Sequence, residues 1–464
     1  MDVVIVGACP VGLMLAAELR LGGARPVVIE RRAEPDDRPR ANGLCGRIVE
    51  QLDHRGLLDR FRAEAGFAGP FPGFPFGPVP LDFTRLDHPP RGLMLQQPRI
   101  EALLEARATE LGADIRRGHE LATLTQDDKG VDLELGDGSH LRARYVVGCD
   151  GAHSRVRELA GIGFPGTTDG ELLRMGHFAA DQPFSVFESP ELGGLRRGWN
   201  RRPGGRVLVT SLTPGVVVVG VREKPASPEE LRGPLSLPEF GESLRRVLGA
   251  DLPLGKPIWL SRTVSEARLA EHYRRGRIFL AGDAAHLFPA GGSALNVGLL
   301  DAVNLGWKLA TGDPAWLDTY ENERRPVAAR TLVQTRVQAL LDRLTGEDGD
   351  ALRTLFGEIA AFPESTSHLA GLLHDADDLP YVPDWPLVVD GRRTRVAEVM
   401  RAARPVLFDF ADRADIREAA TVDVITAECP GAPADAVLVR PDGVIAAMGN
   451  DPRHIREGIT PPGR

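Results

Sequence analysis

Residues 3–12, near the N-terminus, read VVIVGACPVG, and this segment gives the first indication of the fold class. A short continuous apolar run that ends in glycine is typical of a buried parallel strand. The segment 11–21 that follows has helix-like apolar spacing, and two glycines from Gly22 onward end it. A second apolar run, 26–30, completes a βαβ unit, which predicts an α/β protein with a parallel sheet.

The turn of this unit resembles a dinucleotide-binding turn. The usual pattern, G-x-G-x-x-G, needs glycines for a tight turn, for close approach to a pyrophosphate and for helix–strand packing. Gly7 and Gly12 occupy the first and third positions, whereas Cys9 takes the second. Glu30 ends the second strand, where a carboxylate can accept from a ribose hydroxyl, and the helix from Val11 would direct its N–H groups at phosphates.

Cys9 leaves two further interpretations of this turn open. The unit could be an ordinary βαβ element with an incidental glycine turn. The thiol could also have a redox role, since a cysteine at a helix N-terminus can have a lowered pKa. In a dinucleotide site, its β-carbon and sulfur would stand where phosphate oxygens pass, which costs on the order of 1–3 kcal/mol if nothing shifts.

Composition excludes several classes of protein. The chain has 464 residues, which suggests two or three domains, and its 42% hydrophobic and 26% charged residues exclude a disordered chain. A net charge of −9 argues against nucleic acid as the main partner. The apolar run 3–19 is interrupted by Gly7 and Pro10 and is too short to cross a bilayer, so we expect no membrane span and no secretion.

The four cysteines are far apart and form no CxxC pair. They predict neither a disulfide framework nor a zinc site, and favour a reducing, cytoplasmic location. We find no motif with metal-ligand spacing, so no metal is expected, and no residue pattern identifies a catalytic acid or base.

Further elements follow from periodicity and turn signals. We predict a helix over 98–111, a strand over 113–116, and a hairpin of strands 131–135 and 141–147 around a Gly-Asp-Gly turn. Residues 67–92 are rich in Pro and Phe, which predicts a packed segment because a flexible linker would lack the phenylalanines.

The second half of the chain alternates in character. Residues 175–265 carry short β-like runs, of which 207–210 and 216–221 are the clearest strands. A helical pattern covers 325–361, and short strands return over 387–449.

Two more stretches place loops at the carboxyl edge of a parallel sheet. Residues 147–157 read VGCDGAHSRVR, and residues 277–298 read RIFLAGDAAHLFPAGGSALNVG. Each is a strand that ends in an Asp/Gly turn and leads toward a helix, and α/β folds bind ligands at that edge. Asp283 is placed to accept from a sugar-alcohol chain, and the N–H groups of 294–296 are placed to face an electron-rich ring edge.

Together these motifs resemble those of the FAD-dependent aromatic hydroxylases, the class A flavoprotein monooxygenases of p-hydroxybenzoate-hydroxylase type. The resemblance includes DAVNLGWKL at 301–309 and covers nearly the whole chain. Residues 437–443 look like part of the thioredoxin-like domain of the polyketide-tailoring branch, here without a CxxC. The implied fold is α/β: a Rossmann-like FAD-binding domain, a β-sheet substrate domain and a thioredoxin-like C-terminal domain.

The resemblance implies four segments. Residues 1–174 form the first part of the FAD-binding domain, with 70–94 contributing to the substrate side, and 175–265 form the substrate domain. Residues 266–375 complete the FAD-binding domain and its connecting helices, and 376–464 form the thioredoxin-like domain.

The resemblance also assigns cofactor contacts. Glu30 would bind the adenosine ribose, Arg40 and Gln97 the pyrophosphate and ribityl region, and Asp283 the ribityl chain. Residues 294–296 would border the isoalloxazine. The expected cofactor-binding residues are Gly7, Cys9, Pro10, Val11, Gly12, Glu30, Arg31, Arg40, Gln97, Asp150, Gly151, Asp283, Pro289, Gly292, Ala294, Leu295 and Asn296.

Several of these assignments compete with structural interpretations. Asp150 would act near FAD and NADPH, or it is a plain turn aspartate. Three phenylalanines near the substrate side, Phe71, Phe74 and Phe76, would line the substrate site or serve in packing.

The function implied is an FAD- and NADPH-dependent monooxygenase that hydroxylates an aromatic polyketide-type product, with a small hydrophobic polycyclic or polyene substrate. Two departures from the family pattern open an alternative. Cys9 replaces a glycine, and Ala294 adds a β-carbon where flavin should pack or move. A redox-silent cyclase that keeps FAD as a scaffold for a [4+2] closure therefore stays open, as does a cofactor-free binding subunit.

Overall fold

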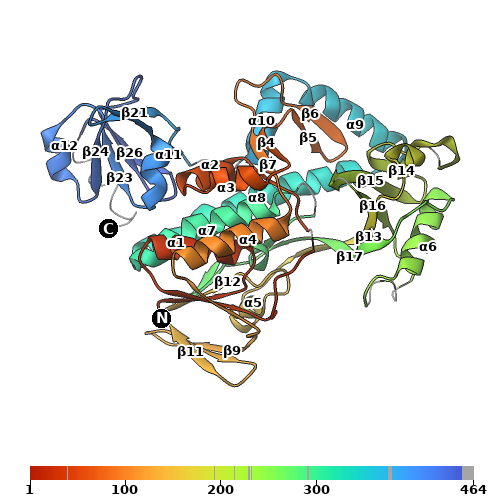
Figure 1. The fold of residues 1–464 in the computed structure, drawn as a ribbon, viewed down its shortest axis with the longest axis horizontal. Coiled ribbons are helices and arrows are strands. Elements are labelled where there is room, and N and C mark those ends of the chain that lie inside the picture. Colours follow the sequence, from red (N-terminus) through yellow and green to blue (C-terminus); the bar gives the residue numbers. More distant parts are fainter. Residues whose placement is uncertain are drawn as a thin grey trace. The chain divides into compact units, whose positions relative to one another are not determined.

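The computed structural model describes residues 1–38, 40–192, 194–213, 215–227, 230, 233–289, 292–374 and 379–451 (Figure 1). They fall into two compact units. The smaller comprises Gly166–Ala267 with residues 288 and 289, and the larger comprises the rest of the described chain. The smaller unit begins at Gly166 rather than at the expected 175, because strand β13 (Gly166–Ala179) is continuous.

A mainly parallel sheet forms the centre of the larger unit. Its order is β18-β19-β12-β1-β2-β8, and all neighbours run parallel except the edge pair β18 and β19. Every residue of β1 is buried, which explains its unbroken apolar sequence. The six strands are β1 (Val3–Val6), β2 (Pro26–Glu30), β8 (Asp114–Arg117), β12 (Tyr145–Gly148), β18 (Arg274–Arg275) and β19 (Ile278–Leu280).

Three helices pack together beside this sheet. Helix α1 (Pro10–Leu21) contacts both α4 (Gln97–Glu110) and α7 (Ala294–Thr311). Helix α7 passes so close to α1 that a β-carbon on Gly306 would lie 2.4 Å from Cβ of Glu18. The predicted βαβ unit and the predicted helix over 98–111 are therefore confirmed.

The predicted strand over 141–147 was wrong in one respect. Its first half is β11 (His140–Ala143), which pairs with β10 (Val131–Leu135) in a separate antiparallel sheet with β9 (Leu121–Gln126). Its second half is β12 of the parallel sheet. The exposed Arg144 separates the two strands, and the chain changes sheets there.

The predicted helix over 325–361 is likewise two helices, α8 (Pro314–Arg343) and α9 (Gly346–Ala360). Leu344 and Thr345 between them have extended backbone conformations, which no α-helix can accommodate.

The Pro- and Phe-rich segment is packed, as predicted. Its strands contribute to a hydrophobic cluster that also contains side chains of α8, α9 and α10 (Pro363–His374). The strands are β4 (Phe67–Pro70), β5 (Gly73–Phe76), β6 (Val79–Asp82) and β7 (Arg91–Met94), and β7 also pairs with β3 (Leu44–Cys45). Helices α2 (Arg47–His54) and α3 (Leu58–Glu64) lie between β3 and β4 in the chain.

The C-terminal part of the larger unit has its own sheet, in the order β24-β23-β25-β26. Strands β23 and β24 are parallel, and the other neighbours are antiparallel. The short strands expected over 387–449 are thus confirmed. The elements are β21 (Pro386–Val389), β22 (Arg392–Arg395), α11 (Val396–Val399), β23 (Val406–Asp409), α12 (Ala414–Ala419), β24 (Asp423–Thr426), β25 (Ala436–Val439) and β26 (Ile445–Gly449).

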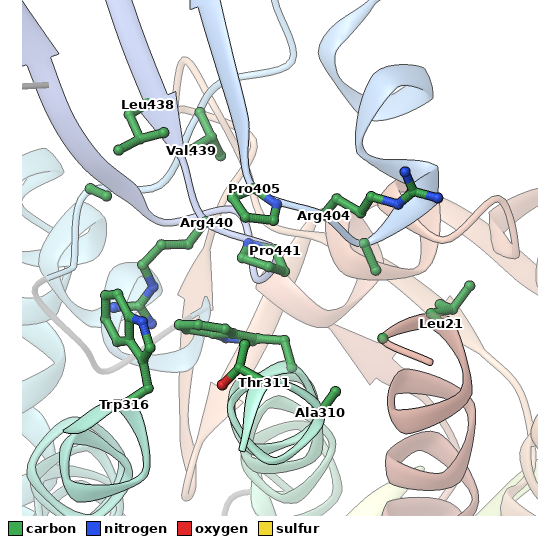
Figure 2. Close-up of a pocket in the computed structure, with 14 residues that line it drawn as sticks. Leu21, Ala310, Thr311, Trp316, Arg404, Pro405, Leu438, Val439, Arg440 and Pro441 are labelled. Carbon is green, nitrogen blue, oxygen red and sulfur yellow. The ribbon is translucent and has the colours of Figure 1, made fainter. Parts of the chain in front are cut away.

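A cavity of about 380 Å³ lies between this C-terminal sheet and the helices α1, α7 and α8. Figure 2 shows Arg440 and Pro441 on one side of it and Thr311 and Trp316 on the other. Both sides belong to the larger unit.

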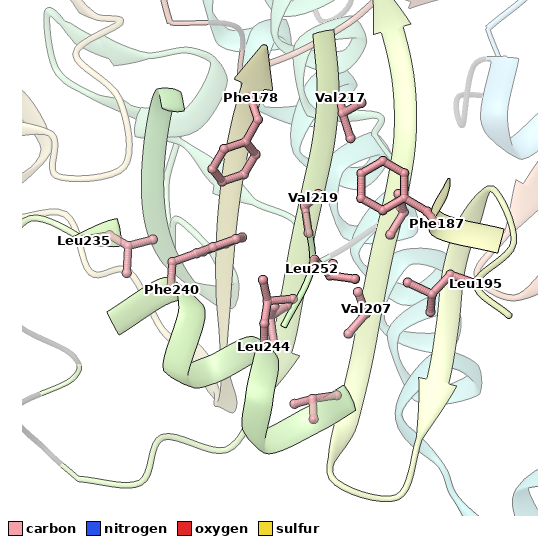
Figure 3. Close-up of a cluster of buried hydrophobic side chains, with 13 residues drawn as sticks. Phe178, Phe187, Leu195, Val207, Val217, Val219, Leu235, Phe240, Leu244 and Leu252 are labelled. Atoms are coloured by element: carbon pink, nitrogen blue, oxygen red, sulfur yellow. The ribbon is translucent and has the colours of Figure 1, made fainter. Parts of the chain in front are cut away.

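The smaller unit is an antiparallel sheet covered by one helix. Figure 3 shows Phe178, Val207 and Val219 of the sheet facing Phe240 and Leu244 of helix α6 (Leu237–Leu248). The strands predicted over 207–210 and 216–221 are confirmed. The sheet contains β14 (Gly198–Arg202), β15 (Gly205–Thr213), β16 (Val216–Glu223), β13 and β17 (Pro257–Leu269).

No helix among the residues that the structure describes combines the length and apolar character needed to cross a bilayer.

Candidate cofactor site

The three sequence motifs meet at the carboxyl edge of the parallel sheet. A β-carbon on Gly7, after β1, would lie 2.4 Å from the carbonyl oxygen of Cys149, after β12. Val11 lies close to both Gly282, after β19, and Gly298 on α7, where a β-carbon would come within 3.0 and 2.9 Å of its side chain. The loops that parallel-strand topology places together are in contact.

Two glycines of the first turn are required by close backbone approach. Gly7 has a φ of +110°, which side-chain-bearing residues rarely adopt. A β-carbon on Gly12 would lie 2.0 Å from the carbonyl oxygen of Gly7, so helix α1 can leave the turn only with glycine there. Pro10 begins α1, where its missing N–H removes no intrahelical hydrogen bond.

Cys9 occupies the N-cap position in an ordinary extended conformation, with φ −80° and ψ 173°. Its Sγ donates to the carbonyl oxygen of Cys149 at 3.1 Å. Burial raises the pKa of the thiol to about 12, although the backbone N–H groups of Gly12 and Val11 oppose the shift. The thiol is neutral near pH 7, which contradicts the lowered pKa that a redox role would need.

Glu30 ties the first turn to the end of β2. Its carboxylate accepts from the backbone N–H of Ala8 at 3.0 Å and from that of Arg32 at 2.9 Å. Since each carboxylate oxygen has two lone pairs, the half-buried group retains capacity to accept from a ligand hydroxyl. The neighbouring Arg31 is exposed.

A cluster of arginines surrounds Asp36 near this edge. Arg32, Arg38 and Arg40 each place a guanidinium within 2.8 Å of its carboxylate. A hydrogen bond from Arg38, with the charges of the other two arginines, lowers the pKa of Asp36 to about 2. Asp36 therefore stays ionised and fixes Arg40, one of the expected cofactor contacts.

Gln97 begins α4 and donates through Nε2 to Glu101 Oε1 at 2.8 Å. Burial raises the pKa of Glu101, and the nearby charges of Asp36 and Arg40 also act on it. The structure thus brings Gln97 and Arg40 into one region. Sequence reasoning missed Glu101, whose position one turn after Gln97 is its only local signal.

Asp150 holds its own loop. It accepts from Ser154 Oγ and, at 3.0 Å, from the backbone N–H of Val156, and Ser154 caps helix α5 (Arg155–Leu159). Burial raises the pKa of the Asp150 carboxyl. Gly151 follows with a φ of +84°, as the turn requires. These contacts favour the structural interpretation of Asp150.

Asp283, in the short helix η4 (Gly282–Ala284), presents an accessible carboxylate to this region. Although the residue is exposed, the protein around it desolvates the carboxyl and raises its pKa, an effect that His286 and Arg40 oppose. An accessible carboxylate held in a desolvating environment is suited to accept hydrogen bonds from ligand hydroxyls.

A buried charge network supports the Asp283 loop. Asp301 accepts from His286 Nε2 at 2.9 Å, from Arg324 Nε at 2.9 Å and from the backbone N–H of Gly282 at 3.2 Å. All three side chains are at most 1% exposed. Burial would raise the pKa of Asp301, but the hydrogen bonds and charges of His286 and Arg324 lower it overall. His286 is therefore part of the scaffold. Sequence reasoning missed Arg324, which carries no local signal.

The first turn of α7 is fixed against β3. Asn296 Oδ1 accepts from the backbone N–H of Cys45 at 3.2 Å, and its Nδ2 lies 3.3 Å from Cys45 Sγ. Ala294 and Leu295 are half-buried, so they keep surface available to a ligand.

Two expected contacts precede α7. Gly292 is exposed, with a φ of +64°. Pro289 is half-buried and belongs to the smaller unit.

The three expected substrate contacts differ in exposure. Phe76 is 2% exposed and stacks on Phe356 of α9 with ring centroids 5.4 Å apart. This packing favours the structural interpretation of Phe76 over its assignment to substrate. Phe71 is half-buried and stacks on Phe67 at 5.7 Å, and Phe74 is half-buried against the same cluster as Phe76.

Among the described residues, no group of three or more His, Cys, Asp or Glu side chains is arranged to hold a metal ion.

Comparison with known proteins agrees with this geometry. The family described as "FAD binding domain" matches residues 1–335, and "Aromatic-ring hydroxylase, C-terminal" matches residues 380–460. The chain belongs to the FAD-dependent aromatic-ring hydroxylases. It is 42% identical to the 12-dehydrotetracycline 5-monooxygenase/anhydrotetracycline 6-monooxygenase of Streptomyces rimosus, over 96% of this chain and 94% of that one.

Two other similar proteins carry different names, one of a hydroxylase and one of a synthase. The crystal structure of an aromatic hydroxylase from angucycline biosynthesis superposes with a TM-score of 0.87 at 37% identity, covering 96% of this chain and 95% of that one. A dialkyldecalin synthase of Streptomyces rugosporus is also 37% identical, over 96% of this chain and 95% of that one.

Three features of this site fit FAD, and one departs from the expected pattern. The Gly7–Gly12 turn brings backbone against backbone, the N-terminus of α1 faces the loops, and the carboxylates of Glu30 and Asp283 retain acceptor capacity. The departure is Cys9, whose sulfur lies near the N–H groups of Val11 and Gly12.

Replacing Cys9 by glycine is therefore expected to tighten FAD binding by up to about 10-fold, equivalent to about 1.4 kcal/mol. Loss of the side chain frees the N–H groups of Val11 and Gly12 for phosphate oxygens. Titration of apoprotein with FAD, followed by quenching of flavin fluorescence, measures the change. Equal or weaker binding by Cys9→Gly would show that the hydrogen bond from Sγ to Cys149 has adapted the loop to cysteine.

Proposed function

We propose that the protein is an FAD- and NADPH-dependent monooxygenase that hydroxylates a small aromatic polyketide-type compound. The observation that carries the proposal is the convergence of three loops, after β1, β12 and β19, on one site in a chain of the FAD-dependent aromatic-ring hydroxylases. The 42% identity to a tetracycline monooxygenase over 96% of the chain supports the substrate class.

Each residue at this site has a binding or positioning role in the proposal. Glu30 holds the adenosine ribose, and the N-terminus of α1 holds the pyrophosphate with help from Arg40 and Gln97. Asp283 binds the ribityl chain, with the Asp301 network fixing its loop. When bound, FAD supplies the electron transfer and O₂ activation that protein side chains cannot.

The first turn of α7 borders the isoalloxazine in this proposal. Ala294 and Leu295 would form its apolar edge, and Asn296 fixes that edge by its contacts with Cys45. Near the substrate side, Phe71 and Phe74 stay candidates for contact with an aromatic ring, since both are half-buried.

A redox-silent cyclase that retains FAD as a scaffold is the second candidate. Cys9 and Ala294 place β-carbons in two cofactor loops, and a cyclase would not need the flavin to move or to meet NADPH. The 37% identity to a dialkyldecalin synthase supports this candidate independently.

Anaerobic addition of NADPH to the yellow holoprotein separates these candidates. We expect the visible flavin absorbance to bleach, and aromatic polyketides to increase NADPH-dependent O₂ uptake. Flavin that stays oxidised with NADPH, both alone and in the presence of aromatic polyketides, would favour the cyclase. Protein purified without flavin and unable to bind added FAD would refute both. A Phe76→Leu variant serves as a control: because Phe76 lies in the core, its flavin should respond to NADPH as that of the wild type does.

We also propose that the C-terminal part is a thioredoxin-like domain without redox function. The βαβ unit β23–α12–β24 followed by the antiparallel pair β25 and β26, in the order β24-β23-β25-β26, supports this assignment. Cys429 is its only cysteine, so it has no dithiol. A cytoplasmic location stays a prediction from cysteine usage.

A further inference from the structure

The turn between β25 and β26, residues 440–443, inserts among helices of the larger unit. Asp442 is 3% exposed and accepts through Oδ2 from Trp307 Nε1 at 3.0 Å and from Asn304 Nδ2 at 3.1 Å, both on α7. Arg440 also pairs with this carboxylate. The C-terminal sheet is thereby attached to α7 through buried, charge-assisted hydrogen bonds.

The backbone of the same turn is held by α2 and by Arg55, the residue that follows it. Gln51 Nε2 donates to the Asp442 carbonyl at 2.7 Å, and Arg55 Nη2 donates to the Pro441 carbonyl at 2.8 Å. Arg55 forms a buried ion pair with Glu18 on α1. One turn therefore contacts α2 and α7 directly and α1 through Arg55.

Arg440 extends the attachment to α8. Its guanidinium lies 2.7 Å from Glu323, which also accepts from Lys308 Nζ at 2.8 Å and from Asn304 Nδ2 at 2.7 Å. Burial would raise the pKa of Glu323, but Arg440 and Lys308 lower it to about 2, so the carboxylate stays charged. Figure 2 shows Arg440 reaching from the C-terminal sheet toward Trp316 of α8.

The helices held by this turn also carry the cofactor loops. On α7, Asn304 lies eight residues after Asn296, about 12 Å along the helix axis. On α8, Glu323 directly precedes Arg324, which pairs with Asp301 and so supports the Asp283 loop. Helices α7 and α8 therefore each contact the 440–443 turn at one place and support the cofactor site at another, and buried contacts fix them at both places.

We propose that residues 440–443 act as a clamp. The clamp holds α7 and α8 in the position in which the loops of the cofactor site retain FAD, and Asp442 is its central positioning residue. The clamp gives the C-terminal part a role that needs no dithiol. This inference rests on FAD binding, as in the proposed function.

The test measures FAD dissociation from the holoprotein of full-length variants. Asp442→Ala removes the acceptor for Trp307 and Asn304, and we expect FAD to dissociate about 10-fold or more faster, a difference of about 1.4 kcal/mol. The flavin absorbance band should also shift, because the environment set by the first turn of α7 changes. Trp307→Phe removes one donor and keeps the ring, so we expect a smaller increase of about 2- to 5-fold, within the range of one hydrogen bond.

Arg395→Ala is the matched control. Arg395 also attaches the C-terminal part, by hydrogen bonds of 2.7 and 2.8 Å to Asp53 on α2. It donates to Asp384 as well, and neither of these partners lies on α7 or α8. We expect this variant to lower the thermal unfolding temperature while leaving the flavin spectrum unchanged and FAD dissociation within about 2-fold.

Equal FAD dissociation in Asp442→Ala and Arg395→Ala, with unchanged flavin spectra, would overturn the clamp. If Asp442→Ala does not fold, Trp307→Phe decides: a dissociation rate and spectrum like those of wild type would overturn the proposal. Wild-type protein that binds no FAD would instead refute the proposed function itself.

Discussion

Replacing Asp301 by alanine is expected to lower the free energy of unfolding by about 3–5 kcal/mol, because the buried guanidinium of Arg324 loses its carboxylate partner. The same substitution removes the acceptor for His286 and for the backbone N–H of Gly282. The Asp283 loop then loses its support, and we expect the purified variant to contain little or no flavin. Chemical denaturation and the ratio of flavin to protein absorbance measure the two effects.

Asp318→Ala provides the comparison for this prediction. Asp318 also pairs with an arginine, Arg274, but its side chain is 71% exposed. Loss of such a surface pair is expected to change stability by about 0–1 kcal/mol and to leave flavin content unchanged. Similar stabilities of the Asp301 and Asp318 variants would show that the buried network does not hold the Asp283 loop in place.

Gly12→Ala is expected to weaken FAD binding by at least about 100-fold, or about 2.7 kcal/mol. The new β-carbon would lie 2.0 Å from the carbonyl oxygen of Gly7. Because this obstructing atom belongs to the backbone, it cannot move aside as the end of a flexible side chain could. The start of α1 must therefore shift away from the turn, which displaces the N–H groups at its N-terminus. We expect stability to fall by about 1–3 kcal/mol, as in other overpacked interiors. FAD titration and denaturant unfolding are the measurements.

The matched control for this substitution is Gly371→Ala in helix α10. A β-carbon on Gly371 meets no atom within 4 Å, and alanine favours the helix. That variant should bind FAD as wild type does and gain up to about 1 kcal/mol of stability. FAD affinity in Gly12→Ala close to that of wild type would contradict the role given to the Gly7–Gly12 contact.

Local patterns in the sequence were sufficient for the parallel sheet and its loops. The apolar run before Gly7 and the Asp/Gly turns at 150–151 and 282–283 each mark the end of a buried strand, and topology brings such ends together. The break at Arg144 could not be predicted in this way. A single polar residue within a strand-like run is also found on the exposed face of a continuous strand, so periodicity gives no sign that the chain changes sheets.

Pairs of side chains that lie far apart in the sequence were the other feature that could not be predicted. Asp301 and Arg324 look like ordinary polar positions of two helices, and only the fold shows that both are buried and paired. Asp442 likewise looks like an ordinary polar residue of a turn, and only the fold shows that it is buried and hydrogen-bonded. From the sequence, Phe76 is consistent with either a substrate wall or a core, and its stack on Phe356, 280 residues later, favours the core.

The pairing of β12 with β19 has a consequence for biosynthesis. Val146 pairs with Ile278, and the segment Gly166–Ala267, which forms nearly all of the smaller unit, lies between them in the chain. The third cofactor loop therefore cannot join the first two until the ribosome has made the inserted unit, and such non-local pairing slows folding. Until then the edge of β12 has no neighbour on that side, and an unpaired strand edge can associate with other chains. Rapid independent folding of the inserted unit would shorten this interval by bringing the two strand segments closer.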